Sequence, residues 1–507
     1  MCQWITPVAL IALTLSITSL SLAQSNDTSP FTRSSDFDGD GIVGFSDFLL
    51  FVEYFGLDHT DETYKARFDL NGNGTIEFSD FLIFVSDFGK TVPLLSDMMN
   101  FPLRALHVGG NWGTNTEVVA EWEATGRVGT LIPPDYIEWL KSLQVNWVGL
   151  SVALHYDDSM DSTVERVYSS DVRIPTFSDE ALRQLIREFR SHGMNVYLTL
   201  AFEAFEAEEA ARPVYRWQMG NPYAPRWWPD YLILPENWPW SIDHPDHERF
   251  VAEFWETYTQ QAVHFARIAQ EEGVQMYSLG TETDYLFRTR SGNRWPNHFG
   301  KELKSMVERV RSVYDGLLTY DMHIDVFRWP HDFGPGSDHL WEDLDLDIIG
   351  FSAWFPLTDL RPSTVLSVET FQASYSQIFQ NLLVPLTNRN PGRPILFTEY
   401  GVIDVVESSQ SPGDSSIAEG RRFVFTDLNG NGLDDGRETQ ANIYQALINT
   451  MAQYPEIVNG VFYWNNWMAS DEHWAEYWAG RRNYDIRGKL AEEVVRAAYE
   501  SYRQANP

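Results

Sequence analysis

Short apolar runs alternate with amphipathic stretches from about residue 97 to the end of the chain. Apolar runs of this length predict buried strands, and apolar residues at helical spacing predict the helices between them. The strand candidates are Ala105 to Gly109, Trp147 to Val152, Val196 to Ala201, Gln275 to Leu279, Leu317 to Tyr320, Ile348 to Ala353, Ile395 to Thr398 and Gly460 to Trp464. The helical patterns are Asp179 to His192 with Ser178 as its N-cap, Glu248 to Glu272, Gly300 to Val313 and Phe371 to Leu383.

Repeated βα units of this kind predict an α/β fold with a parallel sheet. Eight of them fit an elaborated (β/α)8 TIM barrel over residues 97–507, whose active site belongs at the carboxyl ends of the strands. An open doubly wound sheet is the alternative. It is disfavoured because Gly109-Gly110-Asn111-Trp112-Gly113, after the first strand, lacks the spacing of a phosphate-binding loop.

Two segments near the amino terminus repeat one pattern in the same register, 33 residues apart. Calcium needs several oxygen ligands and a sharp turn in the loop that supplies them, and each segment offers oxygen-bearing side chains around a glycine. The predicted ligands are Asp36, Asp38, Asp40 and Asp47 in the first loop and Asp69, Asn71, Asn73 and Asp80 in the second. The alternative interpretation is two Asp/Gly turns without metal.

Each of these loops ends in Asp rather than Glu and is followed by a single Phe-rich helix, and residues 36 to 89 therefore resemble a dockerin module. The resemblance implies a small all-α, EF-hand-type module over residues 36–90 that holds structural calcium. It also implies a cohesin-type partner that docks on residues 36–89.

A third loop of the same type lies within the barrel sequence and leads into the helix pattern Ile443 to Tyr454. Its predicted ligands are Asp427, Asn429, Asn431 and Glu438, and the glutamate can bind calcium through both oxygens. We expect a structural calcium here, and an acidic turn without metal is the alternative.

Composition narrows the classes of function. Acidic residues outnumber basic ones by 72 to 37, which gives a net charge of −35, and no long basic run is present. Nucleic acids and anionic membranes are therefore not expected as partners. The single cysteine, Cys2, precedes the first apolar run, so a processed chain would have no disulfide and no thiol nucleophile. Carboxylates and aromatic rings must carry the chemistry, and we expect no cofactor for catalysis.

The amino-terminal segment from Val8 to Leu22 is apolar, short for a membrane span, and followed by a small residue. It predicts a secretory signal peptide over residues 1–23 and a linker over residues 24–35. The protein is then secreted and extracellular, without membrane attachment after cleavage. A retained membrane anchor is the alternative, because residues 2 to 7 contain no Lys or Arg.

Glu282 follows the fourth predicted strand and Glu399 follows the seventh. Because the carboxyl ends of all strands in a parallel barrel lie on the same side of the barrel, both carboxylates are expected in one cleft. Glycoside hydrolysis needs such a pair, one protonated to donate to the leaving oxygen and one ionised to attack or to activate water. The alternative for each glutamate is a solvated or salt-bridged carboxylate.

Over residues 102 to about 470 the chain resembles glycoside hydrolases of clan A and, within that clan, family 113, the endo-β-mannanases. The likeness rests on Asn146-Trp147-Val148-Gly149-Leu150-Ser151, His155-Tyr156-Asp157-Asp158-Ser159, Gly280-Thr281-Glu282 and Phe397-Thr398-Glu399-Tyr400-Gly401. It implies a retaining reaction with Glu282 as acid/base and Glu399 as nucleophile. Thr281 stands where most clan members have Asn, a departure that we associate with family 113.

Aromatic rings suit the apolar faces of sugars. The resemblance implies that Trp464, which ends the eighth strand, lies under the sugar being cleaved, and further substrate-binding candidates are Trp112, His155 and Trp354. A long loop after the third strand predicts either sugar stacking or a local hydrophobic cluster through Trp217, Trp227, Trp228, Trp238 and Trp240. Glu203 in this region is a spare catalytic candidate.

These observations predict a secreted retaining endo-β-glycosidase that acts on a β-linked polysaccharide, mannan first. Galactan, xylan and β-glucan are alternative substrates. A non-catalytic carbohydrate-binding or scaffold protein is the alternative of another class. The two glutamates at strand ends favour the enzyme.

Overall fold

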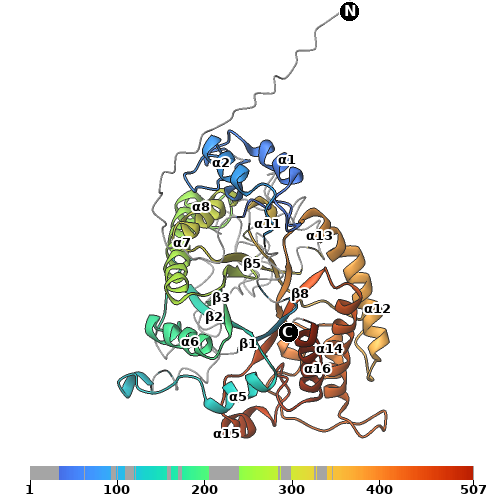
Figure 1. Cartoon of the computed structure of the whole chain (residues 1–507). Coiled ribbons are helices and arrows are strands. Elements are labelled where there is room, and N and C mark those ends of the chain that lie inside the picture. Colours follow the sequence, from blue (N-terminus) through green and yellow to red (C-terminus); the bar gives the residue numbers. More distant parts are fainter. Residues whose placement is uncertain are drawn as a thin grey trace, which may run out of the picture.

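The computed structural model describes residues 34–505 except 62, 93–98, 100, 109–118, 120–121, 157–160, 169–173, 205–238, 284–285, 287–298, 325–326, 328–339 and 345. Eight parallel strands close into a barrel in chain order, with helices arranged around it (Figure 1). The strands are β1 (Leu103–Val108), β2 (Trp147–Tyr156), β3 (Asn195–Ala204), β4 (Met276–Thr281), β5 (Leu317–His323), β6 (Ile349–Ser352), β7 (Ile395–Tyr400) and β8 (Val458–Asn466). The predicted TIM barrel is confirmed, and each predicted strand overlaps an observed one.

Alternate residues of each strand face the barrel interior. These interior residues change from apolar to polar along the strands. The amino-terminal end is filled by a buried apolar cluster: Met99, Phe101, Leu103, Ala105, Trp147, Tyr197, Met276, Leu317, Ile348, Leu396 and Phe462. Small residues follow in the next layer. A Cβ on Gly149 would lie 2.8 Å from the ring of His107, so this layer has no room for a larger side chain there.

At the carboxyl ends of the strands the buried side chains are polar, and they include Ser151, Thr281, Asp321, Ser352 and Glu399. This end of the barrel is where a TIM barrel carries its active site.

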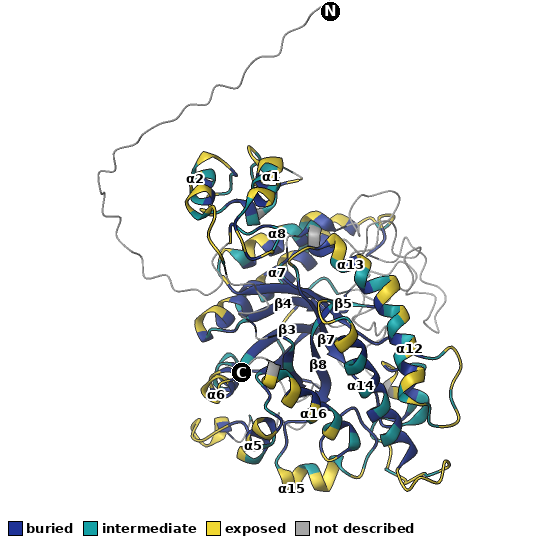
Figure 2. Cartoon of the chain, turned by 45° about the vertical axis from the view of Figure 1, so that its right-hand side comes forward, coloured by how far each residue is buried: buried dark blue, intermediate teal, exposed yellow. Residues whose placement is uncertain are grey.

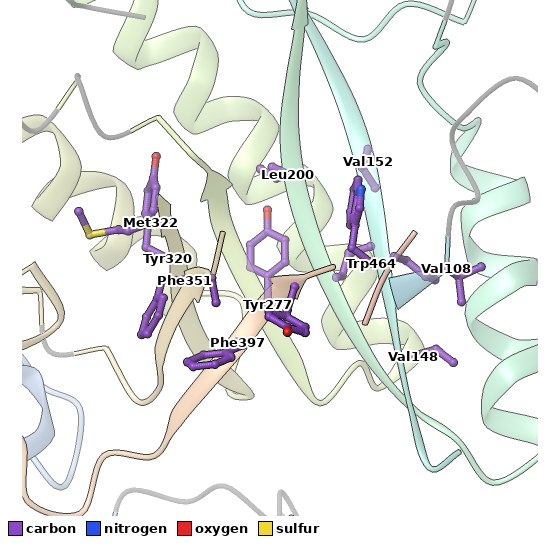
Figure 3. Packing of buried hydrophobic residues seen from close by; sticks show 14 of the residues in the cluster. Val108, Val148, Val152, Leu200, Tyr277, Tyr320, Met322, Phe351, Phe397 and Trp464 are labelled. Carbon is purple, nitrogen blue, oxygen red and sulfur yellow. The ribbon is translucent and has the colours of Figure 1, made fainter. Parts of the chain in front are cut away.

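The outward-facing strand residues pack against the helices in one large hydrophobic cluster. Figure 3 shows part of it, with Phe351 of β6 close to Phe397 of β7. Their ring centroids are 5.2 Å apart. The helices are buried along the face toward the strands and exposed on the other (Figure 2). Those of the barrel are α5 (Pro134–Ser142), α6 (Asp179–Ser191), α7 (His247–Glu272), α8 (Gly300–Arg311), α11 (Leu340–Asp343), α12 (Val368–Ile378), α13 (Val384–Arg389), α14 (Asp435–Gln453), α15 (Asp471–His473) and α16 (Leu490–Ala505).

Local signals explain where two of these helices begin and end. Ser178 is the N-cap of α6, as predicted, and its hydroxyl accepts a hydrogen bond from the backbone N–H of Ala181. Helix α7 ends at Gly273, whose φ of 66° is a left-handed conformation that glycine adopts without steric cost.

The amino-terminal module consists of α1 (Phe45–Tyr54), a short 3-10 turn (Ala66–Phe68) and α2 (Phe78–Asp87). Its small core is made of Phe37, Val43, Phe51, Tyr64, Phe68, Ile76 and Phe84. The module contacts the barrel near α8 (Figure 1), where Lys304 Nζ donates to the carbonyl oxygen of Asp61 at 3.3 Å. Gly39 also packs directly on Gly392, in the turn before β7. That turn lies at the amino-terminal end of the strands, opposite the polar end.

Candidate active site

Glu282 follows the last residue of β4 and points into the polar end of the barrel. Its φ of 54° is left-handed, which is uncommon for a residue with a side chain. Its backbone N–H donates to the carbonyl oxygen of Asp321 at 2.8 Å, and Trp354 Nε1 donates to its Oε1 at 3.0 Å. Only 3% of Glu282 is exposed. The glutamate is therefore held from β5 through its main chain and by Trp354 through its side chain.

Hydroxyl groups around β4 support this unusual conformation. Thr281 Oγ1 lies 2.7 Å from Thr199 Oγ1 of β3. Thr283, the residue directly after Glu282, is hydrogen-bonded to the hydroxyl of Tyr320. Gly280 leaves the necessary space, because a Cβ there would lie 2.6 Å from the Tyr320 hydroxyl oxygen.

Glu399 is the second predicted catalytic residue, and it lies within β7 rather than after it. It is 1% exposed. Ser352 Oγ of β6 approaches its Oε2 at 3.5 Å, and the backbone N–H of Ala353 donates to its carbonyl oxygen at 2.7 Å. Ser352, which ends β6, and the next two residues, Ala353 and Trp354, thus contact the two predicted catalytic glutamates. This brings Glu282 and Glu399 to the same part of the barrel.

The aromatic candidates differ in their surroundings. Trp464 of β8 packs on His107 of β1, with ring centroids 4.4 Å apart. Figure 3 shows Trp464 close to Val152 of β2. Trp354 is largely buried and binds Glu282. Trp240 is buried against Phe250 and Phe254 of α7, which fits the hydrophobic-cluster interpretation for this residue. Trp112 lies outside the described residues. So do the other four tryptophans of the loop, which are Trp217, Trp227, Trp228 and Trp238.

His155 and Glu203 face each other in register at the ends of β2 and β3. His155 is buried, and burial lowers the pKa of its imidazole to about 4. A neutral imidazole is therefore expected here at ordinary pH. Substrate binding by His155 and a catalytic role for Glu203 both stay predictions.

Asp321 is a polar residue of the site that sequence analysis missed. It is fully buried on β5, one residue beyond the predicted end of that strand. Its Oδ1 accepts a hydrogen bond from Ser352 Oγ at 3.1 Å. The signal available in the sequence is an acidic residue directly after the apolar run Leu317 to Tyr320.

The predicted calcium loops of the amino-terminal module fit a hard cation in both geometry and donor type. Ligand oxygens of Asp36, Asp38 and Asp40 all lie within 4.8 Å of one another. Burial raises the pKa of the Asp36 carboxyl, and the neighbouring charges of Asp47 and Asp38 raise it further. Mutual repulsion of this kind is relieved by a bound cation. In the second loop, Asp69 and Asp80 accept backbone N–H groups in the same pattern as Asp36 and Asp47.

The third loop has the same hydrogen-bond pattern around its first residue, whereas its last residue accepts side-chain amides in place of backbone N–H groups. Asp427 accepts the backbone N–H groups of Asn431 and Gly432. Side chains of Asn429 and Asn431 both reach Glu438, at 3.0 and 2.9 Å. Helix α14 begins at Asp435, so Glu438 is presented from its first turn.

The two helices of the amino-terminal module expose equivalent apolar side chains. Phe45 and Phe78 are 65% and 62% exposed, and Leu49 and Leu82 are 56% and 53% exposed. Val52 and Phe55 of the first repeat match Val85 and Phe88 of the second, all about half exposed. These two sets of four residues are called the α1 face and the α2 face below. Exposed apolar surface of this extent marks interaction sites.

The closed parallel barrel buries one glutamate directly after β4 and another in β7, and glycoside hydrolysis requires such a pair of carboxyl groups. Residues 237–489 match the sequence model of Glycoside Hydrolase Family 113, and residues 34–86 match that of the Dockerin type I domain. The chain is thus a glycoside hydrolase similar to family 113, joined to an amino-terminal dockerin module, and both predicted resemblances are confirmed. The family match contains Glu282 and Glu399.

Solved structures agree on the fold. A structure described as a complex of a family 113 β-1,4-mannanase matches with a TM-score of 0.50 and 18% identity, over 79% of this chain and 99% of that one. The family 113 β-mannanase from Alicyclobacillus acidocaldarius matches with a TM-score of 0.52 and 18% identity, over 79% and 98%. No curated protein matches the sequence. Among the described residues, no helix has the length and apolar character to cross a membrane.

Proposed function

We propose that this glycoside hydrolase is a secreted, retaining endo-β-glycosidase whose substrate is β-1,4-mannan. The observation that carries the proposal is the pair of buried glutamates, Glu282 and Glu399, which both contact residues at or just after the end of β6. The family match supports mannan as the substrate, because the similar structures of that family are described as β-mannanases.

The proposed reaction has two steps. In the first, Glu399 attacks the anomeric carbon while Glu282 gives its proton to the leaving glycosidic oxygen, so a glycosyl-enzyme forms and the reducing-end fragment departs. In the second, Glu282 takes a proton from water, and that water displaces Glu399 from the sugar. The hydrogen bond from Trp354 Nε1 supports this dual role, because it fixes one carboxyl oxygen of Glu282 and so orients the carboxyl group.

The buried surroundings support catalysis by Glu399. Its carboxylate is almost inaccessible to bulk water, so the charge interactions that develop during attack are weakly screened. We propose that Trp464 packs against the sugar ring next to the cleaved bond, because its indole lies near the carboxyl end of β8 beside His107. His155, Trp354 and Trp112 are proposed as further contacts to the substrate.

We also propose calcium at all three loops, a cohesin-type partner for the dockerin module, and secretion through residues 1–23. The clustered carboxylate oxygens of the first loop support the first of these proposals. The dockerin match and the exposed α1 and α2 faces support the second. The apolar segment from Val8 to Leu22 supports the third.

The direct test is release of reducing sugar by the full chain from mannan, galactan, xylan and β-glucan. We expect cleavage of mannan with early products of several lengths, which is typical of endo action. Glu399→Gln should abolish it. Glu407→Gln, which changes a glutamate outside the barrel strands, is the matched control and should keep full activity. Activity on another glycan alone would replace the substrate, and activity on none would favour a non-catalytic binding protein.

A further inference from the structure

Asp321 connects the two proposed catalytic residues. Its backbone N–H donates to Ser278 Oγ of β4 at 3.1 Å, and its carbonyl oxygen accepts the N–H of Glu282 at 2.8 Å. The main chain of Asp321 is therefore fixed to β4 on both sides. Its side chain extends toward β6, where Oδ1 accepts from Ser352 Oγ.

Ser352 lies between two carboxylates and has one hydroxyl proton to give. Its Oγ is 3.1 Å from Asp321 Oδ1 and 3.5 Å from Glu399 Oε2. A hydroxyl donates one hydrogen bond at a time, and such bonds weaken steeply toward 3.5 Å. The shorter distance assigns the proton to Asp321, so the Ser352 oxygen and not its proton faces Glu399.

Tyr197 supports this placement independently. Its phenol is buried inside the barrel on β3, and burial raises its pKa well above the usual value. The negative charge of Asp321 raises that pKa further, and Glu399 adds a smaller contribution. Both carboxylates thus face one interior region. Other ionisable side chains near the carboxyl ends of the described strands include His107, His155, Glu203, Glu282 and His323, the last of which lies on β5 two residues beyond Asp321.

We propose that Asp321 is a positioning residue for Glu399, acting through the hydroxyl of Ser352. The inference rests on the proposed role of Glu399 as nucleophile. By holding the Ser352 proton, Asp321 keeps that hydroxyl from donating to Glu399 Oε2 and so from stabilising its charge. Its negative charge also favours the step in which Glu399 loses charge to form the glycosyl-enzyme.

The first test is the pH dependence of kcat/KM in Asp321→Asn, which keeps the side-chain shape and removes the charge. The acid limb of this profile reports protonation of the nucleophile in the free enzyme. Without the charge, and with Ser352 free to donate to Glu399, the ionised form of Glu399 is favoured. We expect the acid limb to move to lower pH by about one unit and kcat to fall about tenfold. A residue that only supports the fold would lower activity without moving the limb.

A double-mutant cycle tests the path through Ser352. If Asp321 acts partly through this hydroxyl, Asp321→Asn should lower kcat less in a Ser352→Ala background than in the wild type. Thr319→Val is the matched control, because Thr319 lies two residues earlier on the same face of β5 and bonds only the carbonyl of Ile348, at 2.9 Å. It should leave the acid limb unchanged. Equal effects of Asp321→Asn in both backgrounds would overturn the path through Ser352.

A second measurement needs no substrate. In protein labelled with carbon-13 at the glutamate carboxyls, the signal lost in Glu399→Gln identifies Glu399, and its titration midpoint can be compared between variants. We expect a lower midpoint in Asp321→Asn, and an unchanged midpoint would overturn the proposal even in an active enzyme. A shifted midpoint in a protein that cleaves no glycan would contradict the proposed function while supporting the link between Asp321 and Glu399.

Discussion

Glu282 takes a backbone conformation that costs energy for most residues, and its neighbours hold it there. A left-handed φ at a residue with a Cβ is disfavoured by about 1 kcal/mol or more. The bonds to Asp321 and Trp354 offset this cost and aim the carboxyl into the barrel. Strain of this kind at a buried glutamate is consistent with a catalytic role, because active sites are where such conformations gather.

The role of Glu282 can be tested by its loss. Glu282→Ala should lower turnover of polysaccharide by about a thousandfold, because the leaving sugar then departs without a proton. Aryl glycosides with good leaving groups need little protonation and should retain more of their rate. Added azide should restore turnover by resolving the glycosyl-enzyme in place of activated water, with a glycosyl azide as product. Full activity of Glu282→Ala on polysaccharide would contradict the assignment.

Full loss on both kinds of substrate is expected for Glu399→Ala, because the carboxylate that forms the covalent intermediate is removed. The contrast between the two variants separates acid/base from nucleophile.

The lowered pKa of His155 leads us to expect that the folded protein loses stability in acid. Its pKa is about 4 in the folded protein and about 6.5 in the unfolded chain, so the unfolded chain binds a proton first as pH falls. The contribution of neutral His155 to the free energy of unfolding is fully present above pH 6.5. It is lost progressively as the pH falls from about 6.5 to 4, by about 3 kcal/mol at most. His155→Gln cannot take up this proton. Unfolding midpoints at pH 7.5 and 4.5 should therefore fall further in the wild type than in the variant, and equal falls would contradict the prediction.

At the scale of elements, the strands were predictable because burial on both faces makes them continuous apolar runs. The exact strand ends were not. Register shifts in the β4–β5, β6–β7 and β7–β8 pairings fall next to Thr281, Ser352 and Tyr400. Bulges of this type re-aim side chains near an active site, and they depend on neighbouring strands that a local pattern does not contain.

The candidate site was therefore predictable only in part. Glu282 and Glu399 stood out because each follows an apolar run and matches a known motif. Asp321 has no such motif, and its importance depends on Ser352, which is 31 residues away in sequence but adjacent in space. Trp354 was expected to bind substrate, and its hydrogen bond to Glu282 could not be read from its position in the chain.

The calcium loops allow a prediction for two separate elements. The dockerin module has only a small core, and a domain of this size gains much of its stability from bound metal. Chelation should unfold residues 36–89 and also lower the thermal midpoint of the barrel, through the loop from Asp427 to Glu438. In calorimetry, Asp69→Ala should affect only the unfolding transition of the dockerin module, and Asp427→Ala only that of the barrel. Midpoints that are the same with calcium and with chelator would contradict calcium binding.

For the whole molecule, the dockerin module and the candidate site lie at opposite ends of the barrel. The module packs on the turn before β7, whereas Glu282 and Glu399 lie at the carboxyl ends of the strands. Both apolar faces of the module remain exposed beside the barrel (Figure 2). Both faces are therefore accessible to a partner.

The equivalence of these faces leads to a prediction about docking. Leu49→Asp disables the α1 face and Leu82→Asp the α2 face, by placing a charge at the centre of each. Because either intact face offers the same apolar contacts, each single variant should still bind a cohesin-type module, and the double variant should not. Calorimetric titration against a panel of cohesin modules measures this. Loss of binding in one single variant would show that only that face docks.

The stereochemical outcome follows from the arrangement of the whole barrel. The Glu399 carboxyl contacts Ser352, the last residue of β6, and the Glu282 carboxyl contacts Trp354, two residues further on, so both carboxyl groups lie near the end of this strand. Retaining enzymes have a carboxyl separation of about 5 to 5.5 Å, while inverting enzymes need about 6.5 to 9.5 Å to place a water between base and sugar. Two carboxyls gathered at one strand end favour the shorter separation and direct attack by Glu399. Each of the two displacements inverts the anomeric carbon, so the β configuration of the substrate should be kept. Proton NMR of the first products from β-mannan should show the β anomer before mutarotation, and initial formation of the α anomer would refute both the mechanism and the pairing of these two glutamates.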